Sequence, residues 1–517
     1  RMVCNTHVSP IKPPERIENA FNDVKEHDDV EKSSVILSKS SKIFPSVRLF
    51  MACLMCMCYI SLAVTTSNLS LSMVCMVRRP SNNTMETPGN PSCPTKYVDE
   101  EEVSIISCAD ANKVDWSPTE QGFVFAAQNF GSLAMLLTGS YADKLNGKWS
   151  IIVALVLLCF SNGLIPVVAS ASVWLVFACR VLAGVGDAFL SPATSSMISR
   201  WFPPKERPFA IGFATGGRQI GSLLILPVAG VLCSTSSNGF GGWPSIFYLS
   251  AIIAVAVLLI WLVASADKPS NHCCVRVKEE EYIRRKVEEE ALGKRIERGR
   301  PPWEAILTSR PLIVAVFALV CHEYPLVIML QLLPKYFSDV LHLSSMTNGL
   351  ISALPIAVLW LSKTLSSSLA SLLTANQKLS KTTSCKAFNF IASLGLGVCV
   401  GVTPFIARAS DPAPAIVVLC LANAFAGIHT PGVQTALIQL APAFSGTVTA
   451  LAYSVVAVFS IINKLLSNTI LATGSTDEWL IVFEISAVIA LLPVVFFTLW
   501  GDAEKQVTYS LHLKYAP

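Results

Sequence analysis

Long apolar stretches follow one another along most of the chain, and shorter polar segments separate them. They lie at about residues 45–77, 119–142, 149–171, 173–200, 208–235, 243–266, 311–337, 347–374, 386–407, 413–439, 446–472 and 478–500. A helix of about 20 residues, rising 1.5 Å per residue, crosses a hydrocarbon core about 30 Å thick. Since each stretch is long enough, the sequence predicts twelve membrane-spanning helices.

Two polar segments interrupt this regular spacing. Residues 78–118 follow the first span, and residues 267–310 separate six spans from six. The second segment contains VKEEEYIRRKVEEEALGKRIERGR, which predicts a solvated helix held by opposite charges at i,i+4 spacing. We therefore expect an N-terminal six-helix bundle over 45–266 and a C-terminal six-helix bundle over 311–500. In transporters built from two such halves, the substrate binds between them near the bilayer midplane.

The composition agrees with an all-α membrane protein. Of the 517 residues, 52% are hydrophobic and 14% are charged, whereas soluble domains carry roughly 25% charged residues. The mean hydropathy is +0.54. The net charge of +4 reflects basic residues in loops, so it indicates membrane topology and not a nucleic-acid partner.

Basic residues in the short loops indicate the orientation of the spans. The loops on one side carry Lys144, Lys148, Arg200, Lys205, Arg207, Lys378, Lys381 and Lys386. Those on the other side carry Arg408. The positive-inside rule places the first side in the cytoplasm, together with a disordered N-terminal tail (1–44) and a C-terminal tail (501–517). The segment 78–118 then lies outside.

The outer segment carries candidate modification sites. Asn82 begins a glycosylation sequon. Cys93 and Cys108 could pair as a disulfide in an oxidising compartment or remain free thiols. Most other cysteines, Cys75 among them, lie within spans, where we interpret them as small apolar side chains.

The stretch RVLAGVGDAFLSP, residues 180–192, places Arg180 and Asp187 within the fourth span. An ionisable residue at a span centre costs about 2.5–3.5 kcal/mol on insertion scales, so it faces a cavity or a partner. The two residues share one helix face but lie roughly 10 Å apart along the axis, too far for a direct bridge. We expect Arg180 and Asp187 to face a water-lined passage and to meet another helix, water, an anion or a proton. The alternative is a structural network without a role in transport.

Further ionisable residues lie within other spans. His322 and Glu323 are neighbours in the seventh span and point about 100° apart, so they cannot face one site. His322 is the functional candidate because its charge changes near neutral pH, the alternative being a histidine hydrogen-bonded within the bundle. Arg218 and Lys363 add positive charge at similar depth and favour an anionic substrate. Lys464 is less informative, since it lies off centre and its side chain could extend outward to the interface.

Two other patterns bear on packing and energy source. Gly212 with Gly216, and Gly217 with Gly221, predict close helix packing in the fifth span. The chain has no G-x-x-x-x-G-K-[ST] phosphate loop, so transport driven by its own ATP hydrolysis is not expected. We predict no enzymatic activity, no metal site and no cofactor beyond a co-transported H⁺ or Na⁺.

The loop after the second span, GSYADKLNGK, resembles the G-x-x-x-D-[RK]-x-G-[RK] signature of the major facilitator superfamily. This resemblance implies two six-helix bundles. It also implies that Gly139, Asp143, Lys144, Gly147 and Lys148 brace a cytoplasmic gate.

Further stretches resemble the anion symporter family that includes sialin, the vesicular glutamate transporters and the type I sodium-phosphate cotransporters. They are RVLAGVGDAFLSP, SRWFPPKER, LPVAG, LPKYF, NGLISALP and GDAEKQ. The resemblance covers about residues 45–506 and implies secondary active transport of organic or inorganic anions, coupled to H⁺, Na⁺ or membrane potential. It also implies roles in substrate and proton handling for Arg180 and Asp187.

The sequence departs from that family at several positions. The run TTSNL, residues 65–69, lacks the arginine that often precedes Asn-Leu in the first span. Phe125 stands where the glutamate transporters have a histidine, and His322 stands where they have an arginine. Arg218 and Lys363 could replace the lost arginine.

We therefore predict a monomeric, lipid-embedded secondary active transporter of a small anion, working by alternating access in the plasma membrane or in an endolysosomal or vesicular membrane. The candidate substrate-binding residues are Arg180, His322, Arg218, Lys363 and Asn68. The candidate proton-coupling residues are Asp187 and Glu323. The alternatives are an uncoupled anion carrier or channel, and a non-transporting receptor or scaffold.

Overall fold

A computed structural model describes residues 46–78, 113–141, 146–203, 207–235, 241–272, 274–294, 303–375, 380–440 and 445–504. These residues form helices, and their β contact is an isolated bridge between Val77 and Val114. The first half comprises α2 (Val47–Met76), α4 (Pro118–Ser132), α5 (Met135–Tyr141), α6 (Gly147–Val168), α7 (Val173–Trp201), α8 (Arg207–Ser234) and α9 (Trp243–Ala264). The connecting segment contains η1 (Pro269–Asn271), α10 (Val277–Lys294) and α11 (Trp303–Thr308).

The second half is interrupted twice by π-helical turns. It comprises α12 (Arg310–Val327), η2 (Ile328–Leu332), α13 (Leu333–Asp339), α14 (Ser345–Ala375), α15 (Lys381–Ile406), α16 (Ala413–Ile428), η3 (Thr430–Gln434), α17 (Thr435–Leu440), α18 (Ser445–Ile470) and α19 (Thr476–Trp500). The turn η2 follows Pro325, and η3 contains Pro431. Proline removes one backbone donor and crowds the preceding turn, which accounts for irregularity at these points.

Several helices begin at residues whose side chains cap them. Ser117 and Glu120 form a reciprocal capping box at the start of α4. Side-chain oxygens of Ser46, Asn146 and Ser475 accept from the first-turn N–H groups of α2, α6 and α19. Because first-turn N–H groups have no intrahelical partner, such caps fix where a helix starts.

Eleven helices of the described residues are long and apolar enough to cross a membrane. The second predicted span differs: residues 119–142 do not form one helix but are divided into α4 and α5. The break follows the point where α4 lies directly on α7, since a Cβ atom at Gly131 would overlap the carbonyl oxygen of Val181, and one at Gly184 would overlap that of Gln128. At the break, Ala134 donates to the Gly131 carbonyl, a tighter turn than in an α-helix.

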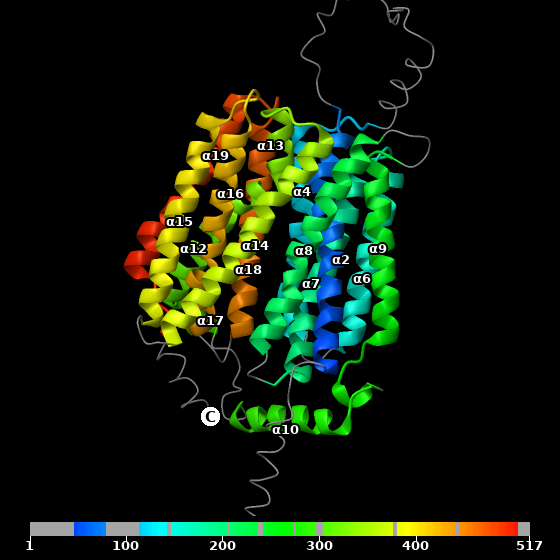
Figure 1. Ribbon diagram of the computed structural model, residues 1–517, viewed down its shortest axis with the longest axis vertical. Coiled ribbons are helices and arrows are strands. Elements are labelled where there is room, and N and C mark those ends of the chain that lie inside the picture. The colour runs from blue at the N-terminus through cyan, green and yellow to red at the C-terminus, as the bar shows by residue number, and fades with distance from the viewer. Residues whose placement is uncertain are drawn as a thin grey trace, which may run out of the picture.

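The helices pack as two bundles side by side, with α10 lying across one end of the molecule (Figure 1). In the first bundle α2 packs on α8 and α9, and α7 on α4 and α6. In the second bundle α15 packs on α16 and α19, and α12 on α18 and α19. The bundles meet where α8 contacts α14 and α4 contacts α18.

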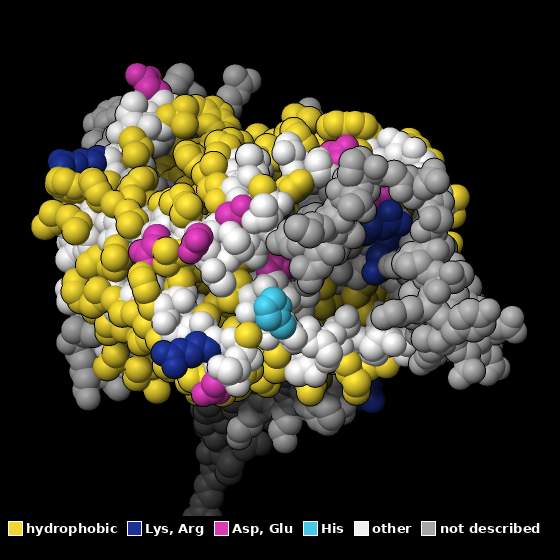
Figure 2. All heavy atoms as spheres, turned by 90° about the horizontal axis from the view of Figure 1, so that it is seen from above, with side chains coloured by type: hydrophobic (Ala, Val, Ile, Leu, Met, Phe, Trp, Pro, Cys, Tyr) yellow, Lys and Arg dark blue, Asp and Glu magenta, His cyan; other side chains and the backbone are white. Residues whose placement is uncertain are grey.

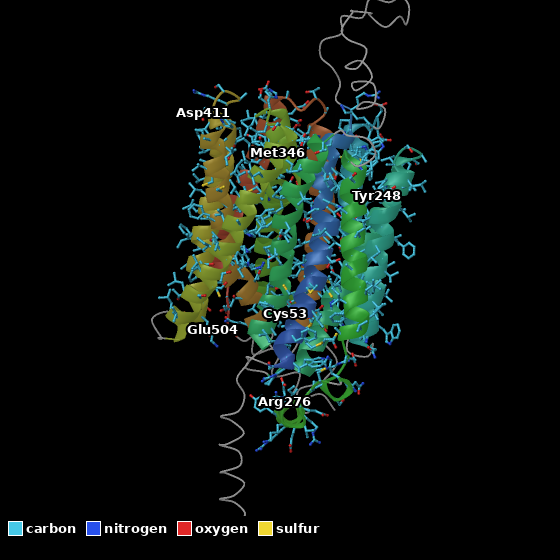
Figure 3. The ribbon with its side chains drawn as sticks, turned by 45° about the vertical axis from the view of Figure 1, so that its right-hand side comes forward. Cys53, Tyr248, Arg276, Met346, Asp411 and Glu504 are labelled. Atoms are coloured by element: carbon cyan, nitrogen blue, oxygen red, sulfur yellow. A yellow bond between two sulfur atoms is a disulfide. The ribbon has the colours of Figure 1, made fainter. Side chains whose placement is uncertain are left out.

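We call the end of the molecule that carries α10 the linker end, and the opposite end the far end. Arg276 and Glu504 lie toward the linker end, whereas Met346 and Asp411 lie toward the far end (Figure 3). Hydrophobic side chains cover much of the far end, with charged side chains scattered among them (Figure 2).

The two bundles share a hydrophobic core at the far end. One cluster joins Met73 and Phe125 of the first bundle to Leu332 and Phe337 of the second. Among the described residues, the linker end has two separate clusters. One lies around Trp201 and Trp261 of the first bundle, and the other around Leu312 and Phe497 of the second. The bundles are therefore packed together at the far end and have separate cores at the linker end.

The glycines of α8 confirm half of the predicted packing. A Cβ atom at Gly217 would overlap the Cys56 carbonyl of α2, and one at Gly221 would lie 2.5 Å from the Ile60 carbonyl. A Cβ atom at Gly212 or Gly216 would meet no heavy atom of the described residues within 4 Å, so the prediction of close packing at this pair is wrong. Only one face of α8 lies on α2.

The helix α10 is anchored to the first bundle at the linker end. The Nε atom of Arg48, at the start of α2, lies 3.1 Å from Glu279 Oε1. The Arg48 guanidinium also lies 5.3 Å from the centre of the Tyr282 ring, and Ile283 is 2% exposed. The charged segment thus forms a helix with one face held by α2, and it is not solvated all round.

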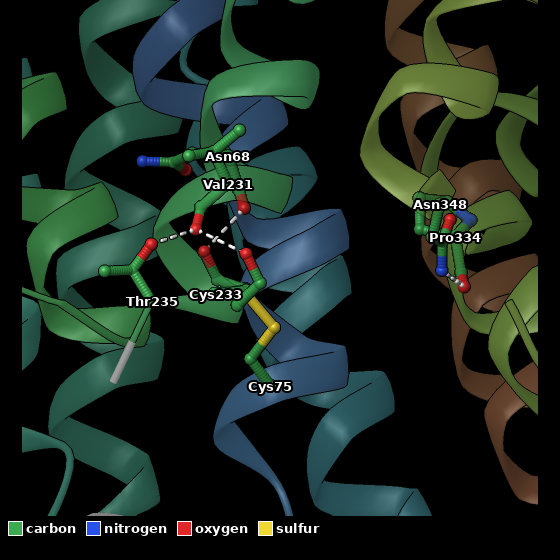
Figure 4. The surroundings of a disulfide bond; sticks show 9 residues. Asn68, Cys75, Val231, Cys233, Thr235, Pro334 and Asn348 are labelled. Atoms are coloured by element: carbon green, nitrogen blue, oxygen red, sulfur yellow. Dashed lines mark hydrogen bonds between the residues drawn. A yellow bond between two sulfur atoms is a disulfide. The ribbon is translucent and has the colours of Figure 1, made fainter. Parts of the chain in front are cut away.

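A disulfide joins Cys75 to Cys233 near the far ends of α2 and α8 (Figure 4). The interpretation of Cys75 as a small apolar side chain is therefore wrong. The sequence could not identify the pair, because the two cysteines are 158 residues apart and meet only when α2 packs on α8. Asn82, Cys93 and Cys108 lie outside the described residues.

Reducing this disulfide, or replacing Cys75 by Ser, should destabilise the first bundle. A cross-link over a long loop typically contributes about 2–4 kcal/mol to the free energy of unfolding. We expect dithiothreitol to lower the Tm of the purified wild-type protein and to leave that of Cys75→Ser unchanged. The control Cys53→Ser, at a free thiol, should retain the response to the reductant. An unchanged wild-type Tm under reducing conditions would contradict the prediction.

Candidate functional site

An ion pair between α7 and α8 occupies the middle of the first bundle's inner helices. Arg218 Nη2 lies 2.5 Å from Asp187 Oδ1, and Arg218 Nη1 lies 3.3 Å from Asp187 Oδ2. Ser191, one helical turn after Asp187, donates to Asp187 Oδ1 at 2.9 Å. The Arg218 guanidinium also lies 5.2 Å from the centre of the buried Tyr59 ring. Asp187 thus finds its partner on another helix.

Solvent reaches this pair from the side of Arg218. The side chain of Arg218 is 39% exposed and that of Asp187 is 10% exposed. Arg218 lies within electrostatic range of Lys363 of α14 and Tyr453 of α18, both in the second bundle. The first bundle therefore presents a hydrogen-bonded carboxylate and a partly exposed guanidinium to the boundary between the bundles.

The second bundle contributes Glu323 of α12 and Lys363 of α14, which interact electrostatically with each other. Among the described residues, neither side chain makes a hydrogen bond or a close ion pair. Tyr453 interacts with both Glu323 and Arg218. The structure thus brings together four of the sequence-predicted residues, Asp187, Arg218, Glu323 and Lys363, from four helices of both bundles.

Arg180 lies away from this group. Its side chain donates to the carbonyl oxygens of Thr65 and Thr66, each at 3.0 Å, and to Gln128 Oε1 at 3.3 Å. The residue is 2% exposed. The expectation that Arg180 faces a water-lined passage is therefore wrong for this conformation, in which backbone dipoles of α2 hold the guanidinium.

His322 stacks on a second histidine, His429, which was not predicted from the sequence. The ring centres are 3.6 Å apart and the planes differ by 3°. Both residues are buried, and His322 also interacts electrostatically with Lys363. His322 Nδ1 and both ring nitrogens of His429 have no hydrogen-bond partner among the described residues. His429 is an ionisable residue within the tenth predicted span, and that signal could have identified it.

Asn68 lies inside the first bundle. It is fully buried, and its Nδ2 atom donates to Asn162 Oδ1 and Ser250 Oγ, each at 2.9 Å. These bonds join α2 to α6 and α9. The contacts of Asn68 are those of a residue that fixes helix packing.

Lys464 is buried between the bundles, so its side chain does not extend outward as the off-centre position would have allowed. Lys464 is 1% exposed. Its Nζ atom donates to the Phe125 carbonyl at 3.0 Å and to Asn129 Oδ1, both on α4. The off-centre position in the sequence did not reveal this contact because α18 faces α4, not lipid, at this point.

The predicted gate segment is partly described. Asp143 and Lys144 lie outside the described residues, and Gly139 belongs to α5. Gly147 begins α6, where its N–H donates to Asp267 Oδ1 at 2.7 Å. Lys148 Nζ donates to two carbonyl oxygens at the end of α9 and beyond it, at 2.9 and 2.7 Å.

Asp267 joins three helices at the linker end and was not predicted. Besides Gly147, it accepts from Arg200 Nη1 at 2.7 Å through both carboxylate oxygens. Arg200 ends α7, and Asp267 follows α9. The described part of the gate segment is therefore braced within the first bundle. The described residues contain no group of three or more His, Cys, Asp and Glu that could hold a metal ion.

The chain forms two helix bundles that are packed together at the far end and have a charged site at their boundary. This arrangement defines a multi-pass membrane carrier of the two-bundle type. The Major Facilitator Superfamily model matches residues 55–463. The chain belongs to this superfamily.

Curated relatives confirm the narrower resemblance at modest identity. The chain is 26% identical to sialin of Homo sapiens over 445 residues, covering 85% of this chain and 86% of sialin. It is 26% identical to vesicular glutamate transporter 2 of Homo sapiens over 397 residues, covering 76% of this chain and 67% of the relative. The inward-open xylose transporter XylE from E. coli has the same fold, with a TM-score of 0.63, 14% identity and coverage of 90% of this chain and 98% of XylE.

Proposed function

We propose that the protein is a secondary active transporter of organic or inorganic anions that works by alternating access and is coupled to H⁺ or Na⁺. The observation that carries the proposal is the Asp187–Arg218 pair, which faces Lys363 and Glu323 across the boundary between the bundles. Arg218 and Lys363 are anion contacts in this proposal, because the Arg218 side chain is 39% exposed and the Lys363 side chain makes no hydrogen bond or close ion pair among the described residues.

Asp187 and Glu323 are the candidate coupling acids. A carboxylate that pairs with an arginine in one state and takes a proton in another can link substrate binding to a proton gradient. The pair is only partly shielded from solvent, which allows a proton or an anion to reach it. The relatives support an anionic substrate, since one of them is named for glutamate.

We place the linker end in the cytoplasm, in accordance with the basic loops. The structure then corresponds to a carrier packed shut on its outer side, a role that the shared core at the far end supports. We propose that the carrier is a monomer and acts in the plasma membrane or in an endolysosomal or vesicular membrane.

Uptake into proteoliposomes tests the proposal. Purified protein is reconstituted and offered phosphate, urate, acidic sugars, glutamate and nucleotides, each with and without a pH or sodium gradient. We expect at least one anion to accumulate above its external concentration when a gradient is imposed. Flux that no gradient accelerates would indicate an uncoupled carrier or channel, and anion binding without flux would indicate a receptor.

A further inference from the structure

Two buried cations, one from each bundle, lie nearer the far end than Asp187. Arg180 of α7 is 2% exposed, Lys464 of α18 is 1% exposed, and the two interact electrostatically. Arg180 donates to Gln128, and Lys464 donates to the next residue of α4, Asn129. The two cations, which come from different bundles, thus bind the same turn of α4, since Lys464 also donates to the Phe125 carbonyl.

No carboxylate neutralises this pair among the described residues. The acceptors of Arg180 and Lys464 are three backbone carbonyls and two side-chain amides. Like charges repel strongly in a medium of low dielectric constant, and neutral dipoles supply no opposite charge. An anion that shares the surroundings of Arg180 and Lys464 during part of the protein's cycle offsets this repulsion.

The other cations at the boundary differ in this respect. Arg218 has Asp187 at hydrogen-bond distance, and Lys363 has Glu323 within electrostatic range. Among the cations that the structure describes at the boundary, Arg180 and Lys464 are therefore the pair without a carboxylate partner.

The donors of this pair are also not all satisfied. Arg180 Nε is buried and has no hydrogen-bond partner among the described residues. A guanidinium presents its N–H groups in a planar fork that fits the oxygens of a carboxylate or phosphate, and such charge-assisted bonds are roughly twice as strong as neutral ones. In this conformation the N–H groups of Arg180 and Lys464 donate to carbonyl oxygens of α2 and α4. In another conformation an oxyanion would take the place of these carbonyls.

We infer that Arg180 and Lys464 form a two-cation site for the carboxylate or phosphate group of an anion. The inference rests on the proposed transport function and adds a second cation, Lys464, from the second bundle. The site lies roughly 10 Å from Asp187 along α7, on the far-end side. An anion entering from the far end meets this site before it reaches Arg218. Because α7 and α18 belong to different bundles, the bound anion connects the two.

Anion-dependent thermal unfolding of the full-length protein tests the site. Succinate, phosphate and chloride are titrated at constant ionic strength into wild type, Lys464→Met, Lys464→Arg and the control Lys381→Met, which makes the same change at an exposed position. We expect succinate or phosphate to raise the wild-type Tm, with at least about tenfold weaker apparent affinity in Lys464→Met. Lys464→Arg and Lys381→Met should bind as the wild type does.

A second measurement needs no variant. Reductive methylation of wild-type lysines, followed by mass spectrometry, should show that succinate or phosphate slows modification of Lys464 and leaves that of Lys381 unchanged. Equal affinity in Lys464→Met, or no protection of Lys464, would overturn the inference. So would equal stabilisation by chloride, because the site would then not select an oxyanion.

The inference and the proposed function fail in different ways. Wild-type uptake that persists undiminished in Lys464→Met would overturn the two-cation site and leave anion transport intact. A wild-type protein that takes up none of the anions would overturn the transport function itself, whatever the binding measurements show.

Discussion

Replacing Asp187 by Asn should abolish gradient-driven accumulation of the substrate while exchange across the membrane survives. The substitution preserves the shape of the side chain and removes its charge, so Arg218 loses the carboxylate that lies 2.5 Å away. If one proton accompanies each substrate, a pH difference of one unit supports about tenfold accumulation at equilibrium. We expect the ratio to fall to about one in Asp187→Asn, measured in proteoliposomes with an imposed pH gradient, with counterflow exchange retained.

Glu484→Gln is the matched control, since it neutralises another carboxylate within a membrane helix. Glu484 lies in α19 near Gly401 and far from Arg218 in the helix packing. The accumulation ratio of the Glu484→Gln variant should equal that of the wild type. Full proton-driven accumulation in Asp187→Asn would exclude Asp187 as the coupling acid and would leave Glu323 as the remaining candidate.

The spans could be predicted from the sequence because each depends on a local property. Apolar runs of sufficient length and the basic loops between them indicate where helices cross, whatever their neighbours are. The break between α4 and α5 could not be read in this way, because it occurs where Gly131 meets Gly184 of another helix. Local hydrophobicity carries no information about that contact.

The candidate site was predictable as a set of residues but not as a set of pairs. The cost of a charge inside a span singled out Asp187, Arg218, Glu323 and Lys363. Which charges meet depends on the rotation of each helix about its axis and on its neighbours. For the same reason Lys464, whose off-centre position would have allowed its side chain to extend outward, contacts α4, and Arg180 contacts the backbone of α2.

The arrangement of the cores indicates which contacts must break during a transport cycle. The far end is held by apolar packing and by a close approach of α8 and α14. A Cβ atom at Gly230 would lie 2.7 Å from the Ser345 carbonyl and 3.1 Å from the Gly349 Cα atom. Backbone atoms cannot move aside as flexible side chains can, so any larger residue at Gly230 forces the two helices apart.

Gly230→Leu should therefore hold the far end open and slow transport at least about tenfold, because alternating access requires closure at each end in turn. Spin labels carried by unnatural amino acids at Met346 and Tyr248, exposed positions on α14 and α9 near the far end (Figure 3), would report the opening as a longer distance. Gly212→Leu makes the same change on the same helix where there is open space, and it should leave both the rate and the distance unchanged. An unaltered distance in Gly230→Leu, with protein of normal Tm, would mean that the α8–α14 contact does not control closure at the far end.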